Sequence, residues 1–125
     1  MLNKWKSKNF FDALKNSING IFYVIKNEKN MKIELVFAIL AIITSFFLKI
    51  NAIEFIIILF VIFFVLFAEF INSAIEKVVD LYTLEYNETA KIAKDISAGA
   101  VTIVSFLSII IGVIIFLPKI INILY

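Results

Sequence analysis

The sequence predicts an all-α integral membrane protein, with three transmembrane helices preceded by an amphipathic surface helix. Its 125 residues are 62% hydrophobic and have a mean hydropathy of +1.02. Soluble domains are only about 45–50% apolar. The apolar residues also gather into three long runs without charge. A chain of this length forms a single domain, and we expect residues 1–125 to be one membrane-embedded unit.

The surface helix is predicted over residues 9–29, where apolar residues recur at helical spacing and polar residues occupy the other side. Residues 1–32 also carry seven of the twelve lysines. A basic amphipathic helix suits an anionic membrane surface, and the alternative is a helix packed on a soluble core. The apolar face comprises Phe11, Leu14, Ile18, Ile21, Phe22 and Ile25, and the polar face comprises Asp12, Lys15, Asn16 and Asn19.

The three spans are predicted over residues 33–49, 53–76 and 96–118. The third contains 23 residues without charge, enough to cross a bilayer by itself. The uncharged centres of the first two hold only 14 residues each, against the roughly 20 that a span needs. Polar flanking side chains that reach toward the membrane surface can extend both spans.

Lysine distribution predicts the orientation. With three spans, the N-terminus and the segment 77–95 lie on the same side of the membrane. We expect residues 81–95 of that segment to form a polar loop. That side holds ten of the twelve lysines. Because cytoplasmic segments carry the excess of Lys and Arg, we expect both to be cytoplasmic.

A polar stripe interrupts the second apolar run. On a helix, Glu69, Asn72, Glu76 and Asp80 share one face less than a quarter-turn wide. A carboxylate inside the membrane costs about 2.5–3.5 kcal/mol and usually serves function. The structural alternative is that Glu69 and Glu76 pair with lysines across a helical bundle or lie at a hydrated helix end.

The composition restricts the chemistry of this stripe to carboxylates. The chain has no histidine and no cysteine, which removes the commonest general base, thiolate chemistry and the usual transition-metal ligands. Glu28 and Glu76 could hold Mg²⁺ together with substrate phosphates. Lys91, Lys94 and Asp95 follow in the polar segment, and a lysine can neutralise phosphate. The sequence has no glycine-rich phosphate loop.

Phosphoryl transfer needs a metal, cationic help and a residue that orients or deprotonates the acceptor. Glu69, deepest in the membrane, could take a proton from a lipid alcohol. Two other classes stay open from the residues alone. A small ion-coupled transporter would use Glu69 as its coupling site, and a structural oligomeric protein would tolerate Gln and Asn throughout the stripe.

The stripe and its surroundings resemble the small prokaryotic diacylglycerol kinase family, which includes the undecaprenol kinases of Gram-positive bacteria. The likeness covers nearly the whole chain. Its specific part is Glu69-x-x-Asn-Ser-Ala-Ile-Glu-x-x-Val-Asp80, and further matches are Glu85-Tyr86, Ala90 to Asp95, Ala98 to Val101, and Ala13, Ser17, Gly20, Glu28 and Asn30.

The resemblance implies a three-span homotrimer in the bacterial cytoplasmic membrane, with MgATP-dependent active sites shared between subunits and no nucleic-acid partner. It implies that Glu69 accepts the proton and binds the lipid with Ala98, and that Glu28 and Glu76 bind magnesium and ATP. The other implied nucleotide contacts are Ser17, Glu85, Tyr86, Asn87, Lys94 and Asp95, with Asn72 and Asp80 in supporting roles. Many relatives have His where this chain has Asn87.

The segment from Ala90 to Asp95, the pair Asp80-Leu81 and the stretch from Phe116 to Pro118 look more like the undecaprenol kinase branch. The expected reaction is phosphorylation of undecaprenol to undecaprenyl phosphate. The alternative is conversion of diacylglycerol to phosphatidic acid.

Overall fold

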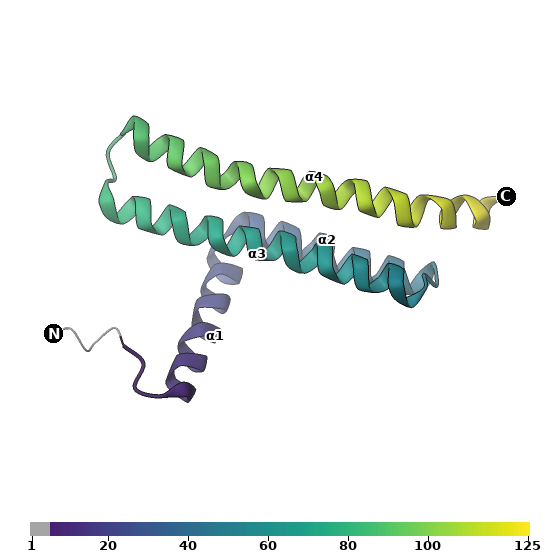
Figure 1. Cartoon of the computed structure of the whole chain (residues 1–125), viewed down its shortest axis with the longest axis horizontal. Coiled ribbons are helices and arrows are strands. Elements are labelled where there is room, and N and C mark those ends of the chain that lie inside the picture. Colours follow the sequence, from purple (N-terminus) through teal and green to yellow (C-terminus); the bar gives the residue numbers. More distant parts are fainter. Residues whose placement is uncertain (1–5) are drawn as a thin grey trace.

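The computed structural model describes residues 6–125 and folds them into four α-helices (Figure 1). Helices α2, α3 and α4 run alongside one another, whereas α1 projects across their direction from the start of α2. The all-helical prediction is confirmed, and Lys4 of the basic N-terminal segment lies outside the described residues. The helices are α1 (Phe10–Asn27), α2 (Lys29–Phe47), α3 (Ala52–Tyr82) and α4 (Glu88–Leu124).

Glu28 separates α1 from α2. Asn9 caps the start of helix α1, and its side chain accepts a hydrogen bond of 2.9 Å from the Asp12 backbone N–H. The helix ends where Glu28 adopts an extended backbone, with φ −92° and ψ 123°. The next residue, Lys29, already begins α2. A single non-helical residue therefore lets α1 leave the direction of the other helices, as Figure 1 shows.

The turn between α2 and α3 is short. Lys49 has a φ of 50°, the left-handed conformation in which many helices end. The Lys49 N–H donates to the Phe46 carbonyl, and the Ile50 N–H donates to the Ser45 carbonyl, each at 3.2 Å. Helix α3 then opens with a capping box, in which Asn51 and Glu54 each accept a backbone hydrogen bond from the other. These local bonds make α2 and α3 antiparallel neighbours.

Three helices of the described chain, α2, α3 and α4, are long and apolar enough to cross a membrane. The helices exceed the predicted spans at most ends, because helix formation does not stop where the hydrocarbon stops. Helix α2 starts at Lys29 and ends at Phe47, α3 continues to Tyr82, and α4 passes through Pro118 to Leu124. How much of each helix lies in the bilayer stays a prediction.

The prediction of a polar loop over residues 81–95 was wrong for most of that stretch. The connection occupies only residues 83–87, and Glu88 begins α4. Asn87 caps the helix by accepting a 3.0 Å hydrogen bond from the Ala90 N–H. Lys91 and Asp95 then pair one helical turn apart, which supports helix. The polar residues of this stretch indicate exposure to solvent, but they lie on an exposed helix and not in a loop.

Few side chains are buried within the single chain. The buried apolar residues are Met31, Ala38, Leu48, Ile58 and Ile115, whereas most large apolar side chains of α2, α3 and α4 are exposed. At the end of the bundle away from the α3–α4 loop, Lys119 pairs with Glu54 at 3.2 Å. The exposed apolar surface therefore requires lipid or another subunit to cover it.

Candidate active site

The polar stripe of α3 faces inward. Glu69 is only 2% exposed, and Asn72 and Ser73 are also buried. The Glu69 Oε2 atom and the Ser73 hydroxyl are buried without a hydrogen-bond partner in the described structure. An unpartnered carboxylate oxygen is costly to bury. This position is the one expected of a carboxylate that forms a hydrogen bond to a bound molecule.

Asn72 links α3 to α4. Its side-chain amide donates a hydrogen bond to Glu76 Oε1 at 3.3 Å. Its carbonyl oxygen accepts a hydrogen bond from the hydroxyl of Ser97 at 2.5 Å. These two hydrogen bonds orient the Asn72 amide, so that its nitrogen faces the Glu76 carboxylate and its oxygen faces α4. This geometry fits the supporting role expected of Asn72.

Glu28, at the junction of α1 and α2, reaches α3. Its Oε1 atom lies 3.5 Å from Nζ of Lys77, the residue after Glu76. Because Lys77 directly follows Glu76, this contact places Glu28 beside the turn of α3 that carries Glu76, and Glu69 lies about two helical turns earlier on α3. The structure therefore brings the three predicted carboxylates into one region, although Glu28 precedes Glu69 by 41 residues in the sequence.

A cavity of about 260 Å³ lies beside the α3–α4 loop. Lys94 crosses between the helices and pairs with Asp80 at 2.6 Å. Lys91 pairs with Asp95 at 2.5 Å. Both cations thus lie at the cavity with a carboxylate beside each. The cavity collects six of the predicted residues: Asp80, Glu85, Tyr86, Asn87, Lys94 and Asp95.

Two predicted site residues lie outside this constellation. Ser17 is exposed on α1 and donates its hydroxyl to the Ala13 carbonyl at 2.9 Å. Ala98 is exposed on α4, where its carbonyl accepts from Thr102. Neither lines the cavity beside the loop. Both side chains lie on the exposed surface of the single chain.

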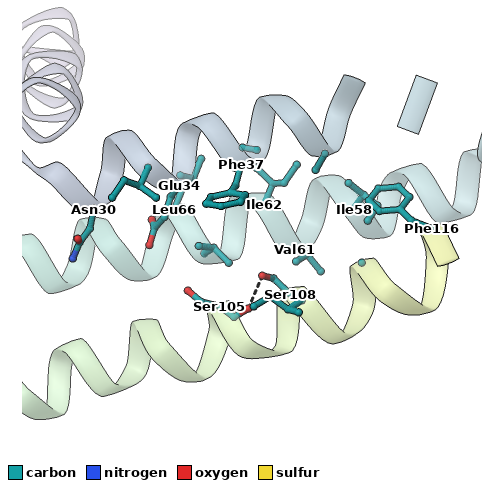
Figure 2. Close-up of a pocket in the computed structure, with 16 residues that line it drawn as sticks. Asn30, Glu34, Phe37, Ile58, Val61, Ile62, Leu66, Ser105, Ser108 and Phe116 are labelled. Carbon is teal, nitrogen blue, oxygen red and sulfur yellow. Dashed lines mark hydrogen bonds between the residues drawn. The ribbon is translucent and has the colours of Figure 1, made fainter. Parts of the chain in front are cut away.

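A second, apolar cavity of about 470 Å³ lies between α2, α3 and α4. In Figure 2, Asn30 and Glu34 lie toward one end, and Ile58 and Phe116 toward the other. The α3 residues Ile58, Ile62 and Leu66 line it, and Glu69 follows Leu66 by one helical turn on the same face. The cavity therefore leads along α3 toward Glu69.

Comparison with known proteins identifies the family of the chain. A family model described as prokaryotic diacylglycerol kinase matches residues 15–116. The chain belongs to that family. The match includes both cavities and every predicted site residue. As a member of the prokaryotic diacylglycerol kinase family, the protein is a membrane lipid kinase that needs a phosphoryl donor and, typically, a divalent metal.

Three relatives illustrate the range of the family. Undecaprenol kinase of Bacillus subtilis is 37% identical over 110 residues, which cover 88% of this chain and 89% of that protein. A diacylglycerol kinase of Synechocystis is 29% identical over 124 residues, 98% of this chain and 71% of that protein. Diacylglycerol kinase of Escherichia coli is 34% identical over 84 residues, 67% of this chain and 69% of that protein.

The donor set of this lipid kinase suits a hard divalent cation. Glu28 and Glu76 offer carboxylate oxygens, which Mg²⁺ prefers, and phosphates and water can complete its shell. Within residues 6–125, no three acidic side chains are grouped closely enough to hold a metal ion themselves. The residues present thus fit a metal that arrives with nucleotide phosphates, rather than one held by the protein alone.

Sequence reasoning missed two residues of the site. Ser97 is buried and fixes Asn72, and the signal available was its position one helical turn after Lys94. Glu34 lines the apolar cavity, and its Oε2 atom is buried without a partner in the described structure. In the sequence Glu34 is only the charged residue before the apolar run that begins at Leu35, and nothing in that pattern indicates that it lines a cavity.

Proposed function

We propose that the protein transfers the γ-phosphate of ATP to the hydroxyl of undecaprenol, giving undecaprenyl phosphate. The observation that carries the proposal is the buried Glu69 carboxylate, which has an unpartnered oxygen and lies one helical turn after Leu66, a residue that lines the apolar cavity. The undecaprenol kinase of Bacillus subtilis supports the choice of lipid through its 37% identity over most of both chains. Diacylglycerol is the alternative acceptor, in keeping with the diacylglycerol kinase relatives.

The apolar cavity supplies a path for the lipid tail. Its walls come from three helices and are almost wholly aliphatic or aromatic, apart from Asn30, Glu34, Ser105 and Ser108. Burial of hydrocarbon there would leave the polar end of the lipid beside Glu69. A long isoprenoid would extend beyond the cavity, which holds about 470 Å³, into the surrounding bilayer.

In the proposed reaction, Glu69 accepts the proton of the lipid hydroxyl. The hydroxyl oxygen forms a bond to the γ-phosphorus, and the bond between that phosphorus and the oxygen bridging to ADP breaks. Asn72 holds Glu76 in position. Lys94 lies opposite Asp80 at the loop cavity and offers positive charge to the transferring phosphates.

The nucleotide is proposed to occupy the loop cavity, which Glu85, Tyr86, Asn87 and Asp95 line. Glu28 and Glu76 would hold Mg²⁺, which neutralises phosphate charge when it is bound. Asn87 already caps α4 through its side chain, so its side-chain oxygen is committed to the backbone. Nucleotide contacts at this position would then come from its amide nitrogen.

We further propose a homotrimer in the bacterial cytoplasmic membrane, with the N-terminus and the segment 77–95 facing the cytoplasm. Helix α1 would lie on the membrane surface, since none of its residues is buried in the chain. Ser17 and Ala98 are exposed on the surface of their own chain, which favours sites completed by a neighbouring subunit.

The test is lipid phosphorylation by the purified protein in detergent, with γ-labelled ATP and either undecaprenol or diacylglycerol. We expect Mg²⁺-dependent label in undecaprenol at a higher kcat/KM than in diacylglycerol. A reversed ratio would assign the diacylglycerol alternative. Label in neither lipid would refute the proposed reaction.

A further inference from the structure

Lys77 joins three separate parts of the chain, and nothing in the proposed reaction uses it. It projects from α3 directly after Glu76. Its Nζ atom lies 3.5 Å from Glu28 Oε1, at the junction of α1 and α2. The same ammonium lies 5.8 Å from the centre of the Tyr23 ring on α1, within the range of a cation–π contact.

These contacts matter because α1 has little else to hold it against the chain. None of its residues, Phe10 to Asn27, is buried. The Glu28 side chain makes no cap on α2, so its carboxylate is free to face α3. That side chain is 20% exposed and the Lys77 side chain 49% exposed. The pair is therefore partly shielded from solvent, which strengthens it over a fully exposed pair.

We propose that Lys77 is a positioning residue that fastens α1 to α3 and holds Glu28 beside Glu76. The Lys77 ammonium on α3 forms an ion pair with Glu28 at the junction and a cation–π contact with Tyr23 on α1. Loss of that charge frees the junction, so that Glu28 and Glu76 no longer approach as a pair. This inference rests on the proposed function in one respect only, the use of Glu28 and Glu76 for the metal–nucleotide complex.

The first experiment measures the position of α1 without reference to catalysis. The chain has no cysteine, so spin labels can be attached at Lys15→Cys on α1 and Leu81→Cys on α3, both exposed positions. Distances between the labels are measured in detergent micelles for native Lys77, Lys77→Met and Lys77→Arg. We expect a narrow distribution for Lys and Arg and a broader, longer one for Met. An unchanged distribution in Lys77→Met would overturn the proposal.

Tyr23 provides a matched pair of variants. Tyr23→Phe keeps an aromatic face and should preserve the narrow distribution, whereas Tyr23→Leu should broaden it. If Lys77→Met does not yield a folded protein, Lys77→Gln is measured in its place. Equal broadening by Phe and Leu would remove the aromatic contact from the proposed role.

The second experiment separates nucleotide from lipid kinetics. Lys77→Met should raise KM for Mg·ATP several-fold and leave KM for the lipid unchanged, and Lys77→Arg should restore the native value. A change confined to the lipid KM would contradict the positioning role. If no lipid is phosphorylated at all, the proposed function fails, while the label distances still decide whether Lys77 fastens α1.

Discussion

The Glu69 carboxylate lies in apolar surroundings, where a negative charge is energetically unfavourable. It is 2% exposed, and Oε2 is buried without a partner in the described structure. Lysines do form ion pairs with acidic residues nearby, but the pairs involve Glu28 and Asp80 rather than Glu69. The structural alternative, in which Glu69 exists to pair with a lysine across the bundle, therefore has no support among the observed pairs.

Replacement of Glu69 by Gln tests its assignment as the proton acceptor. The glutamine side chain has nearly the size of glutamate, and its amide can still form hydrogen bonds. It cannot accept a proton from the lipid hydroxyl. Turnover should fall by about 10²–10⁴-fold, measured as labelled lipid formed per minute. Size-exclusion chromatography and circular dichroism should match the native protein. Near-native turnover would remove Glu69 from this role.

Among the helical elements, the turn between α2 and α3 carries a local strain. Lys49 occupies a left-handed backbone conformation with φ of 50°, which glycine adopts without steric cost. The two backbone hydrogen bonds that close the turn depend on this conformation. The turn lies at the end of the bundle away from the α3–α4 loop, as Figure 1 shows. Its sequence can therefore change without contact with the proposed site.

Lys49→Gly should stabilise the fold by about 1 kcal/mol, because a left-handed conformation costs an L-residue roughly 1–2 kcal/mol. Lys49→Ala is the control, since it removes the same charge but keeps the steric cost. Unfolding by SDS in mixed micelles should give a higher midpoint for Gly than for Ala, with kinase turnover unchanged in both. Equal midpoints would show that the backbone strain is relieved elsewhere.

Across the whole molecule, the balance of buried and exposed surface is that of an incomplete assembly. The core of the single chain is small, and large apolar side chains line the outside of α2, α3 and α4. Lipid can cover such a surface, but it cannot supply polar groups to a site. Two predicted site residues, Ser17 and Ala98, are exposed on the surface of the single chain, and this is the specific reason to expect a neighbouring subunit at the site.

The resemblance to the prokaryotic diacylglycerol kinase family implies that this oligomer is a trimer when it is active. Light scattering coupled to chromatography, with the detergent contribution subtracted, should give a protein mass three times that of the 14.3 kDa chain. Cross-linking in native membranes should give the same number of subunits. A monomer with full kinase turnover would contradict the shared-site arrangement.

The sequence by itself determined the three apolar helices and the carboxylate stripe, whereas the membrane-surface position of α1 stays a prediction. These follow from composition and from the periodicity of neighbouring residues, which are local properties of a helix. Polarity misled at residues 88–95, where an exposed helix was taken for a loop. The repeat of Glu69, Asn72, Glu76 and Asp80 identified a face but could not name what that face meets.

Only the tertiary structure decided the partners. Ser97 meets Asn72, Lys94 meets Asp80, and Lys77 meets Glu28. Each pair joins different elements of the chain, so no local pattern predicts it. These contacts depend on how the packed helices are rotated relative to one another and on the extended backbone of Glu28 between α1 and α2. For the same reason, the sequence did not show that Glu34 lines the apolar cavity, which forms only where α2, α3 and α4 pack together.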